Sequence, residues 1–184
     1  MAFDSAKARN LILWIAYQLD TPSVPDIWSI IYLAERSHLA LTGRAMINDT
    51  FVAMKRGPVP LQAYTELYAR SGRWLRGCEP SHLDIWLKGI AFRTGQRELS
   101  KSFTFVAQNC ICDAVTAAKQ MGINALGKHV RGQAWECAGL DGLLDPLEMA
   151  REGGADAATL EHVLSWREMP YLMEATVGLF SHCR

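Results

Sequence analysis

The sequence has no hydrophobic run long enough to cross a membrane. Its longest apolar stretches, such as residues 11–17, have the length of core helices and fall well short of the roughly 20 residues that a bilayer requires. The chain also does not open with a basic region, an apolar run and a small-residue cleavage site, because Asp4, Gln18 and Asp20 flank the first apolar stretch. These absences predict a cytoplasmic protein with no membrane partner.

Net charge and paired cysteines are also lacking. The 19 Lys and Arg residues balance the 19 Asp and Glu residues, so the positive excess of a dedicated nucleic-acid binder is missing. The five cysteines are odd in number and show no disulfide-framework spacing, which favours a reducing compartment. They lie at Cys78, Cys110, Cys112, Cys137 and Cys183.

Charge is nevertheless distributed unevenly along the chain. Residues 51–101 contain nine Lys or Arg and four Asp or Glu, whereas residues 141–175 contain two and eight. Two surfaces of opposite charge would steer a charged protein partner, or a second copy of the chain, toward the molecule. The alternative, that both regions face solvent or each other, stays open.

The sequence does contain enough apolar material for one core. With 184 residues and 49% hydrophobic content, it predicts a single domain. Apolar residues recur at helical spacing, and capping or breaking residues stand near the expected helix ends. The predicted helices cover residues 4–19, 26–43, 60–70, 109–122, 124–130, 145–154 and 156–180.

Two other segments complete the predicted fold. Residues 49–54 permit another short helix, which Gly57, Pro58 and Pro60 must end, because glycine tolerates positive φ and each proline removes a donor. Residues 83–106 carry apolar residues on both sides of a Thr-Gly turn signal, which predicts a small β-hairpin. The predicted fold class is therefore mainly α: a compact single-domain helical fold with one small β-hairpin.

Candidate catalytic and metal-binding residues are few and scattered. Cys137 and His129 are the nearest nucleophile and base, but Gly132 separates them and no nucleophile motif surrounds them. The five histidines show no ligand spacing, and the glycines of residues 151–155 lack the lysine of a phosphate loop. The sequence predicts no cofactor and no metal, and a small enzyme that uses Cys137, His129 or a carboxylate is the alternative.

A nucleic-acid interface is a second alternative. Residues 70–76 mix arginines with Trp74, as single-strand binders do, and residues 49–70 can be interpreted as a helix-turn-helix around Gly57. A solvated loop whose tryptophan packs on the core explains the same residues, and the Gly-Pro-Val-Pro connection is stiffer than the usual turn. A DNA-binding regulator is disfavoured but open.

Large aromatic residues are numerous for one small domain, with six Trp and five Tyr. Most of them must form the core. A surplus would suit a contact surface, because aromatic and Arg side chains are enriched where protein partners bind.

One stretch of the chain resembles a known family. The segment Ile31-Tyr32-Leu33-Ala34-Glu35 is followed by Gly43, by Ala53-Met54-Lys55-Arg56-Gly57-Pro58-Val59-Pro60 and by Tyr64. An apolar helix of this kind, a glycine beyond it and a Gly-Pro-Val step into a Tyr-bearing helix resemble the Panacea domain, also called SocA-like. Weaker similarity continues at Leu126-Gly127-Lys128-His129 and Ala134-Trp135, whereas Met54 departs from the family's usual Trp or Leu.

The resemblance implies an antitoxin of a bacterial or prophage toxin-antitoxin system, which neutralises a cognate protein toxin encoded nearby by direct binding. Alternatives are an adaptor that delivers the toxin to a protease and a DNA-binding transcriptional regulator. The resemblance covers roughly residues 11–153 and, with the length of the chain, predicts a single Panacea domain over residues 1–184. Residues 155–184 have no counterpart in the family and are expected to form a C-terminal helical extension. Such a protein needs no chemistry of its own, and a homo-oligomer stays open. The expected partner-binding residues are Lys55, Arg56, Pro58, Tyr64, Tyr68, Arg73 and Trp74.

Overall fold

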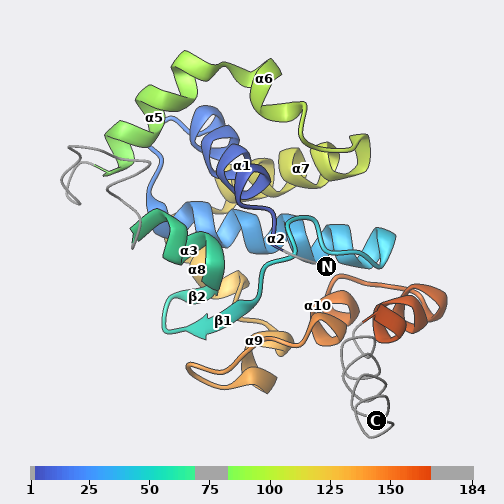
Figure 1. Ribbon diagram of the computed structural model, residues 1–184. Coiled ribbons are helices and arrows are strands. Elements are labelled where there is room, and N and C mark those ends of the chain that lie inside the picture. Colours follow the sequence, from blue (N-terminus) through green and yellow to red (C-terminus); the bar gives the residue numbers. More distant parts are fainter. Residues whose placement is uncertain (1–2, 69–82, 167–184) are drawn as a thin grey trace, which may run out of the picture.

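The computed structural model describes residues 3–68 and 83–166, which form a mainly helical body around one long central helix (Figure 1). Helix α2 crosses the middle of the molecule, with α1, α5 and α6 above it and the hairpin β1–β2, α9 and α10 below it in this view. Residues 157–166 are also helical. The elements are α1 (Ser5–Gln18), α2 (Val24–Thr42), β1 (Phe51–Met54), β2 (Gly57–Pro60), α3 (Leu61–Tyr68), α5 (Leu83–Thr94), α6 (Gln96–Ser100), α7 (Phe105–Met121), α8 (Ile123–His129), α9 (Gln133–Ala138) and α10 (Pro146–Glu152).

Helix α2 is central because buried residues occur in all of its turns. Ser23 caps its start by accepting a hydrogen bond from the Asp26 amide at 3.3 Å, and Gly43 ends it in the left-handed conformation with a φ of 64°. Helices α1, α7 and α10 and strand β2 pack around it. The other elements are therefore positioned by their contacts with this helix.

The N-terminal helix and the α5–α7 segment cover one side of α2. Asp4 caps α1, accepting a hydrogen bond from the Lys7 amide at 2.9 Å. Trp14 of α1 lies against Phe103, with ring centroids 5.7 Å apart. This layer leaves the opposite side of α2 to the hairpin and to α10.

The β-hairpin predicted over residues 83–106 is wrong, because this segment forms α5, α6 and the start of α7. Its apolar residues also fit helical spacing, since Leu87 and Ala91 are buried one turn apart. Gly95, with a φ of 80°, follows α5, and its amide donates to the Ala91 carbonyl oxygen at 3.0 Å. The turn signal around Gly95 therefore marks the end of a helix.

The small hairpin of the predicted fold class lies instead at residues 51–60. The short helix predicted over residues 49–54 is wrong, because strand β1 pairs there antiparallel with β2. A run of four apolar residues fits a strand as well as a helix, and the presence of a partner strand decides between them. The helix-turn-helix interpretation of residues 49–70 is wrong for the same reason, since two strands precede α3.

The other predicted helices are confirmed where the structure describes them. Helices α1, α2, α3, α7, α8 and α10 lie where the spacing predicts, with shifts at their ends, and α9 was not predicted. Helix α3 begins at Leu61, one residue after the predicted Pro60. The predicted helix end near Arg70 and residues 167–180 lie outside the described residues. Across residues 3–68 and 83–166, no helix combines the length and the apolar character needed to span a membrane.

Candidate partner-binding site

The hairpin presents two of the predicted partner-binding residues at its tip. Strands β1 and β2 are joined by Lys55 and Arg56, and both of these side chains are exposed. Neither side chain forms an ion pair with any residue that the structure describes. Two cations are therefore available to a partner at a defined point of the surface.

Gly57 shapes this turn in a way that other residues resist. Its φ is 130°, in the region that favours glycine. A Cβ atom at this position would also lie 2.6 Å from Val130 Cγ2, well inside normal contact distance. The expectation that Gly57 supplies an unusual backbone conformation is confirmed, and close packing against Val130, the residue that follows α8, adds a second requirement.

A strand-like segment that was not predicted extends the hairpin. Residues 142–144 run along β1 on the side away from β2, with Leu143 opposite Val52. The Ala53 amide donates to the Gly142 carbonyl oxygen at 2.9 Å, and the Leu144 amide donates to the carbonyl oxygen of Phe51 at 2.9 Å. Together, β2, β1 and the 142–144 segment form a small antiparallel sheet.

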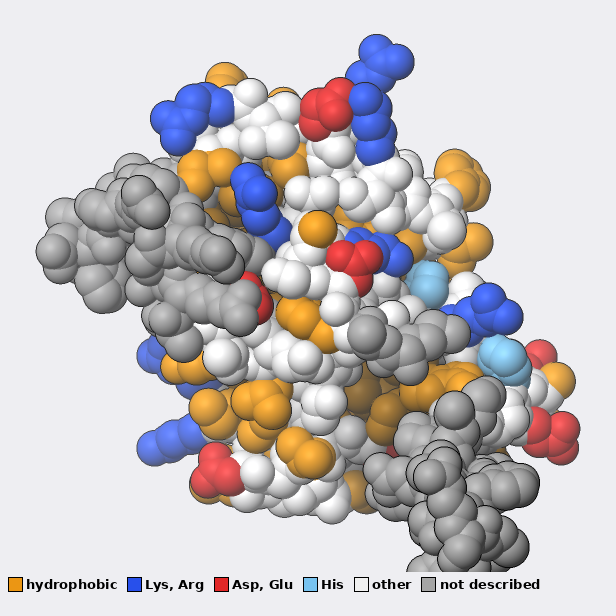
Figure 2. Space-filling view, in the orientation of Figure 1, with side chains coloured by type: hydrophobic (Ala, Val, Ile, Leu, Met, Phe, Trp, Pro, Cys, Tyr) orange, Lys and Arg blue, Asp and Glu red, His pale blue; other side chains and the backbone are white. Residues whose placement is uncertain are grey.

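The two faces of this sheet differ in exposure. Side chains alternate between the faces, and the inner face is buried, with Phe51 lying against Tyr32 of α2 at a ring-centroid distance of 5.7 Å. The other face is half-buried or exposed, and Figure 2 shows hydrophobic side chains gathered in this region at the lower left, with Lys and Arg side chains at the margin. We call it the outer sheet face; it consists of Val52, Met54, Val59 and Leu143.

The free edge of β2 carries no backbone donor. The bonds of β1 to the 142–144 segment use its odd-numbered residues, so its even-numbered residues face β2. In this register Gly57 and Val59 face β1, which leaves Pro58 and Pro60 on the outer edge. Proline has no N–H group, so another strand cannot pair there in the usual way.

Helix α3 is fixed to the base of the hairpin by Asp49. The Asp49 carboxylate accepts hydrogen bonds from the Gln62 amide at 2.9 Å and the Ala63 amide at 2.8 Å, and so caps the first turn of α3. Burial raises the pKa of Asp49, although these amides act in the opposite direction. The helix presents Tyr64 beside the hairpin, with its ring 6.4 Å from that of Trp28 between centroids.

The structure brings together some of the predicted partner-binding residues. Lys55, Arg56 and Tyr64 are exposed on or beside the hairpin. Pro58 is buried, so in this position it fixes the hairpin and offers little surface to a partner. The remaining predicted residues are Tyr68 at the end of α3 and, outside the described residues, Arg73 and Trp74. Binding by all of these residues stays a prediction.

Helices α8 and α9 support the tip of the hairpin from behind. Trp135 Nε1 donates a hydrogen bond to the Met54 carbonyl oxygen at 3.0 Å. The guanidinium of Arg131 lies 6.0 Å from the centroid of the Trp135 ring, and its Nε donates to the Gly127 carbonyl oxygen at 3.0 Å. A Cβ atom at Gly127 would lie 3.6 Å from the Arg56 carbonyl oxygen, so α8 lies directly beside the turn.

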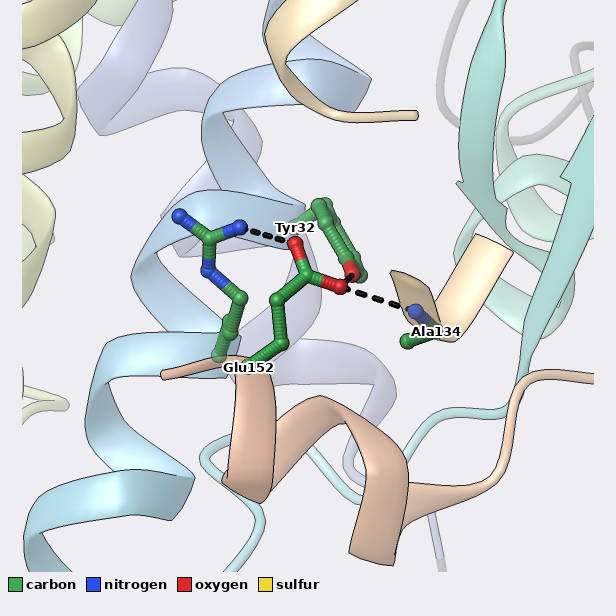
Figure 3. Close-up of polar contacts among 4 residues, drawn as sticks. Tyr32, Ala134 and Glu152 are labelled. Carbon is green, nitrogen blue, oxygen red and sulfur yellow. Dashed lines mark hydrogen bonds and ion pairs between the residues drawn. The ribbon is translucent and has the colours of Figure 1, made fainter. Parts of the chain in front are cut away.

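Glu152 of α10 ties α9 to α2, as Figure 3 shows. Its carboxylate pairs with Arg36 and accepts hydrogen bonds from the Ala134 amide at 2.9 Å and the Tyr32 hydroxyl at 3.4 Å. Burial and the nearby Glu152 charge raise the pKa of Tyr32 above its usual range. A Cβ atom at Gly132 would lie 2.3 Å from Glu152 Oε1. This one carboxylate links three elements, and no local sequence pattern identifies it.

The loop between α2 and the hairpin is held by Glu35. Its Oε1 accepts a hydrogen bond from the Met46 amide at 2.7 Å, and its side chain is almost completely buried. Burial raises the pKa of the Glu35 carboxyl to about 7. The second carboxylate oxygen has no hydrogen-bond partner among the described residues. A charged residue within an apolar helical stripe is the sequence signal that could have identified it.

The described residues do not assemble a reacting centre. Cys137 is exposed and forms no hydrogen bond with His129. Burial, followed by the nearby Asp113 charge, raises the pKa of Cys110 and of Cys112, which disfavours the reactive thiolate. In the part of the chain that the structure describes, no group of three His, Cys, Asp or Glu residues could hold a metal ion.

Similarity to a known protein family was found for the segment that contains the hairpin. A family model described as Antitoxin SocA-like, Panacea domain, matches residues 30–102, which run from within α2 through the hairpin and α3 to beyond α6. No curated protein and no solved structure matched the chain. The similarity expected around Leu126 and Trp135 lies beyond this match and stays a prediction. Residues 30–102 of the chain are therefore similar to the Panacea domain of SocA-like antitoxins.

Proposed function

We propose that the chain is an antitoxin that neutralises a cognate protein toxin, encoded nearby, by direct binding. The Panacea match supports the class of protein. The observation that carries the proposal is the hairpin itself: an exposed turn with two unpaired cations beside an apolar outer sheet face. Surfaces of this composition are suited to burying a protein partner.

The hairpin is rigid enough to bind without a large cost in ordering. Gly57 is packed against Val130, and the Met54 carbonyl oxygen is held by Trp135. Preorganised contact residues lose little conformational freedom on binding, so more of the interaction energy appears as affinity. Lys55 and Arg56 would contribute mainly to the rate and selectivity of association with a negatively charged surface.

This function needs no reaction of the chain's own. Direct neutralisation leaves the toxin present but inactive, whereas an adaptor that delivers the toxin to a protease lowers its amount. Immunoblotting of the toxin in cells that express both proteins separates these two mechanisms. Direct binding predicts an unchanged toxin level together with restored growth.

Growth rescue tests the proposal. The neighbouring reading frame is expressed alone and together with this chain, and rescue of the arrested growth is expected in the second case. The charge-reversed Lys55→Glu/Arg56→Glu variant should rescue poorly. The matched control is Arg93→Glu/Arg97→Glu, which reverses two exposed cations on α5 and α6; it should rescue fully. A neighbour that is harmless by itself would contradict the proposal.

A further inference from the structure

The loop that connects α9 to the 142–144 segment has a specific conformation that its glycines and hydrogen bonds define. Gly139 and Asp141 have positive φ values of 69° and 62°, which for aspartate costs energy that the surrounding bonds must offset. A Cβ atom at Gly142 would lie 2.0 Å from the Ala138 carbonyl oxygen, so only glycine fits there. The Asp141 amide donates to the Ala53 carbonyl oxygen at 2.8 Å. The loop is thus fixed to β1.

This fixed loop displays two leucines to solvent. Leu140 and Leu143 are each 62% exposed. Single exposed leucines are common on protein surfaces, but Leu143 lies opposite Val52, which in turn lies opposite Val59. Side chains in such a cross-strand row are neighbours, so the exposed Leu143 continues an apolar row whose other two members are half-buried, with Val59 packing in part against the core.

Positive charge borders this apolar surface. Lys55 and Arg56 form the hairpin turn, and Lys128 and Arg131 lie on and just after α8, which packs beside that turn. Lys55, Arg56 and Lys128 form no ion pair with any residue in the described ranges. The adjoining residues 127–144 contribute two exposed carboxylates, Glu136 and Asp141, so the three exposed cations outnumber them. The border therefore favours a surface that carries carboxylates.

We propose that residues 139–144 are a second binding element, which together with the outer sheet face docks a partner protein whose apolar surface is bordered by Asp and Glu. This inference rests on the proposed antitoxin function and places the toxin on that face. It adds Leu140 to the contact residues of the outer sheet face, and both Leu140 and Leu143 lie outside the Panacea match.

A second copy of the chain fits this face less well. The acidic residues that follow the loop are largely engaged within the molecule: Glu148 pairs with Arg151, and Glu152 pairs with Arg36. The Asp156 carboxylate accepts a hydrogen bond from the Thr159 amide at 2.8 Å. Among the residues that the structure describes here, few carboxylates therefore remain free to face the cations of another copy.

The test measures affinity for the purified product of the neighbouring reading frame by biolayer interferometry. The Leu140→Ser/Leu143→Thr variant should bind at least about tenfold more weakly, because a buried leucine contributes on the order of a tenfold change or more in affinity. Leu41→Ser is the matched control. Leu41 is 68% exposed at the end of α2, on the far side of Figure 1 from the hairpin, and its variant should bind like the wild type.

Two further measurements make each outcome decisive. Circular dichroism checks folding, and Leu140→Ser alone replaces the double variant if the latter fails to fold, since Leu140 lies outside the strand ladder. Raising the salt concentration should slow association of the wild type much more than that of Lys55→Glu/Arg56→Glu.

The possible results separate the two proposals. Wild-type affinity in the folded leucine variants would overturn this inference and leave the antitoxin function standing. Failure of the wild type to bind the neighbour's product would overturn both. A leucine variant that changes only the oligomeric state, measured by light scattering, would show that the face belongs to a second copy and would also overturn the inference.

Discussion

Replacing Glu35 by Gln should remove a pH dependence of stability that this carboxyl imposes on the fold. Glu35 is 1% exposed inside α2, with the Met46 amide on one oxygen and no described partner on the other. Its ordinary pKa is 4.5, and burial raises the pKa to about 7 in the folded protein. Between these pH values, the folded chain keeps a proton that the unfolded chain releases.

The sign and size of the effect follow from this difference. Because the folded pKa is raised, the stability contributed by Glu35 is fully present below about pH 4.5 and is lost as the pH rises through about 7. Each pH unit in this interval changes the free energy of unfolding by about 1.4 kcal/mol, so the whole interval corresponds to roughly 3 kcal/mol. Glutamine keeps the acceptor for the Met46 amide and cannot ionise.

Urea unfolding between pH 4.5 and pH 8 measures the effect. The informative quantity is the difference between wild type and Glu35→Gln at each pH, because His38 and Asp49 titrate in both proteins; burial lowers the pKa of His38 and raises that of Asp49. The exposed Glu136→Gln change is the control and should show no such trend. A wild-type-minus-variant difference that stays constant within about 1 kcal/mol across this range would refute the reasoning.

Two further substitutions test the framework around the hairpin. Gly57→Ala should destabilise the fold by about 3 kcal/mol in thermal unfolding, because alanine there combines a strained φ with a clash against Val130. The control is Gly89→Ala inside α5, where the space around the added methyl group is open. This variant should be neutral or slightly stabilising in the same assay. Glu152→Ala should lower the free energy of unfolding by roughly 3 kcal/mol, because it leaves Arg36 unpaired in a largely buried position. Its control, Glu148→Ala, breaks the more exposed pair with Arg151 and should lower the free energy of unfolding by at most about 1 kcal/mol. If a variant and its control were equally destabilised, the role given to the contact of Gly57 or of Glu152 would be contradicted.

Local signals in the sequence predicted most helices correctly. Helix α2 has apolar residues at helical spacing along its length and a glycine at its end, and Gly43 adopts the left-handed conformation that this position requires. The prediction was wrong for residues 83–94 because their apolar residues fit two periods. They alternate with polar residues, as in a strand, and they also recur one helical turn apart. The helix predicted over residues 49–54 was wrong for a related reason, since four apolar residues are too few to distinguish a strand from a helix.

The candidate site was only partly predictable. The turn of Lys55, Arg56 and Gly57 follows from local sequence, because glycine and proline restrict the backbone wherever they occur. The pairing of Leu143 with Val52 and the contact of Glu152 with Tyr32 join residues that are far apart along the chain. No local rule specifies such contacts, since they depend on how the completed helices pack.

The edge of β2 that carries Pro58 and Pro60 constrains how the proposed recognition of a toxin could evolve. An edge with free amides would accept almost any extended segment, because backbone pairing ignores side-chain identity. Here the amides are either used within the sheet or absent, so discrimination falls to the side chains of the outer sheet face. Under the proposed antitoxin function, substitutions at Val52, Met54 or Leu143 would then change which toxin is bound while the backbone scaffold stays unchanged.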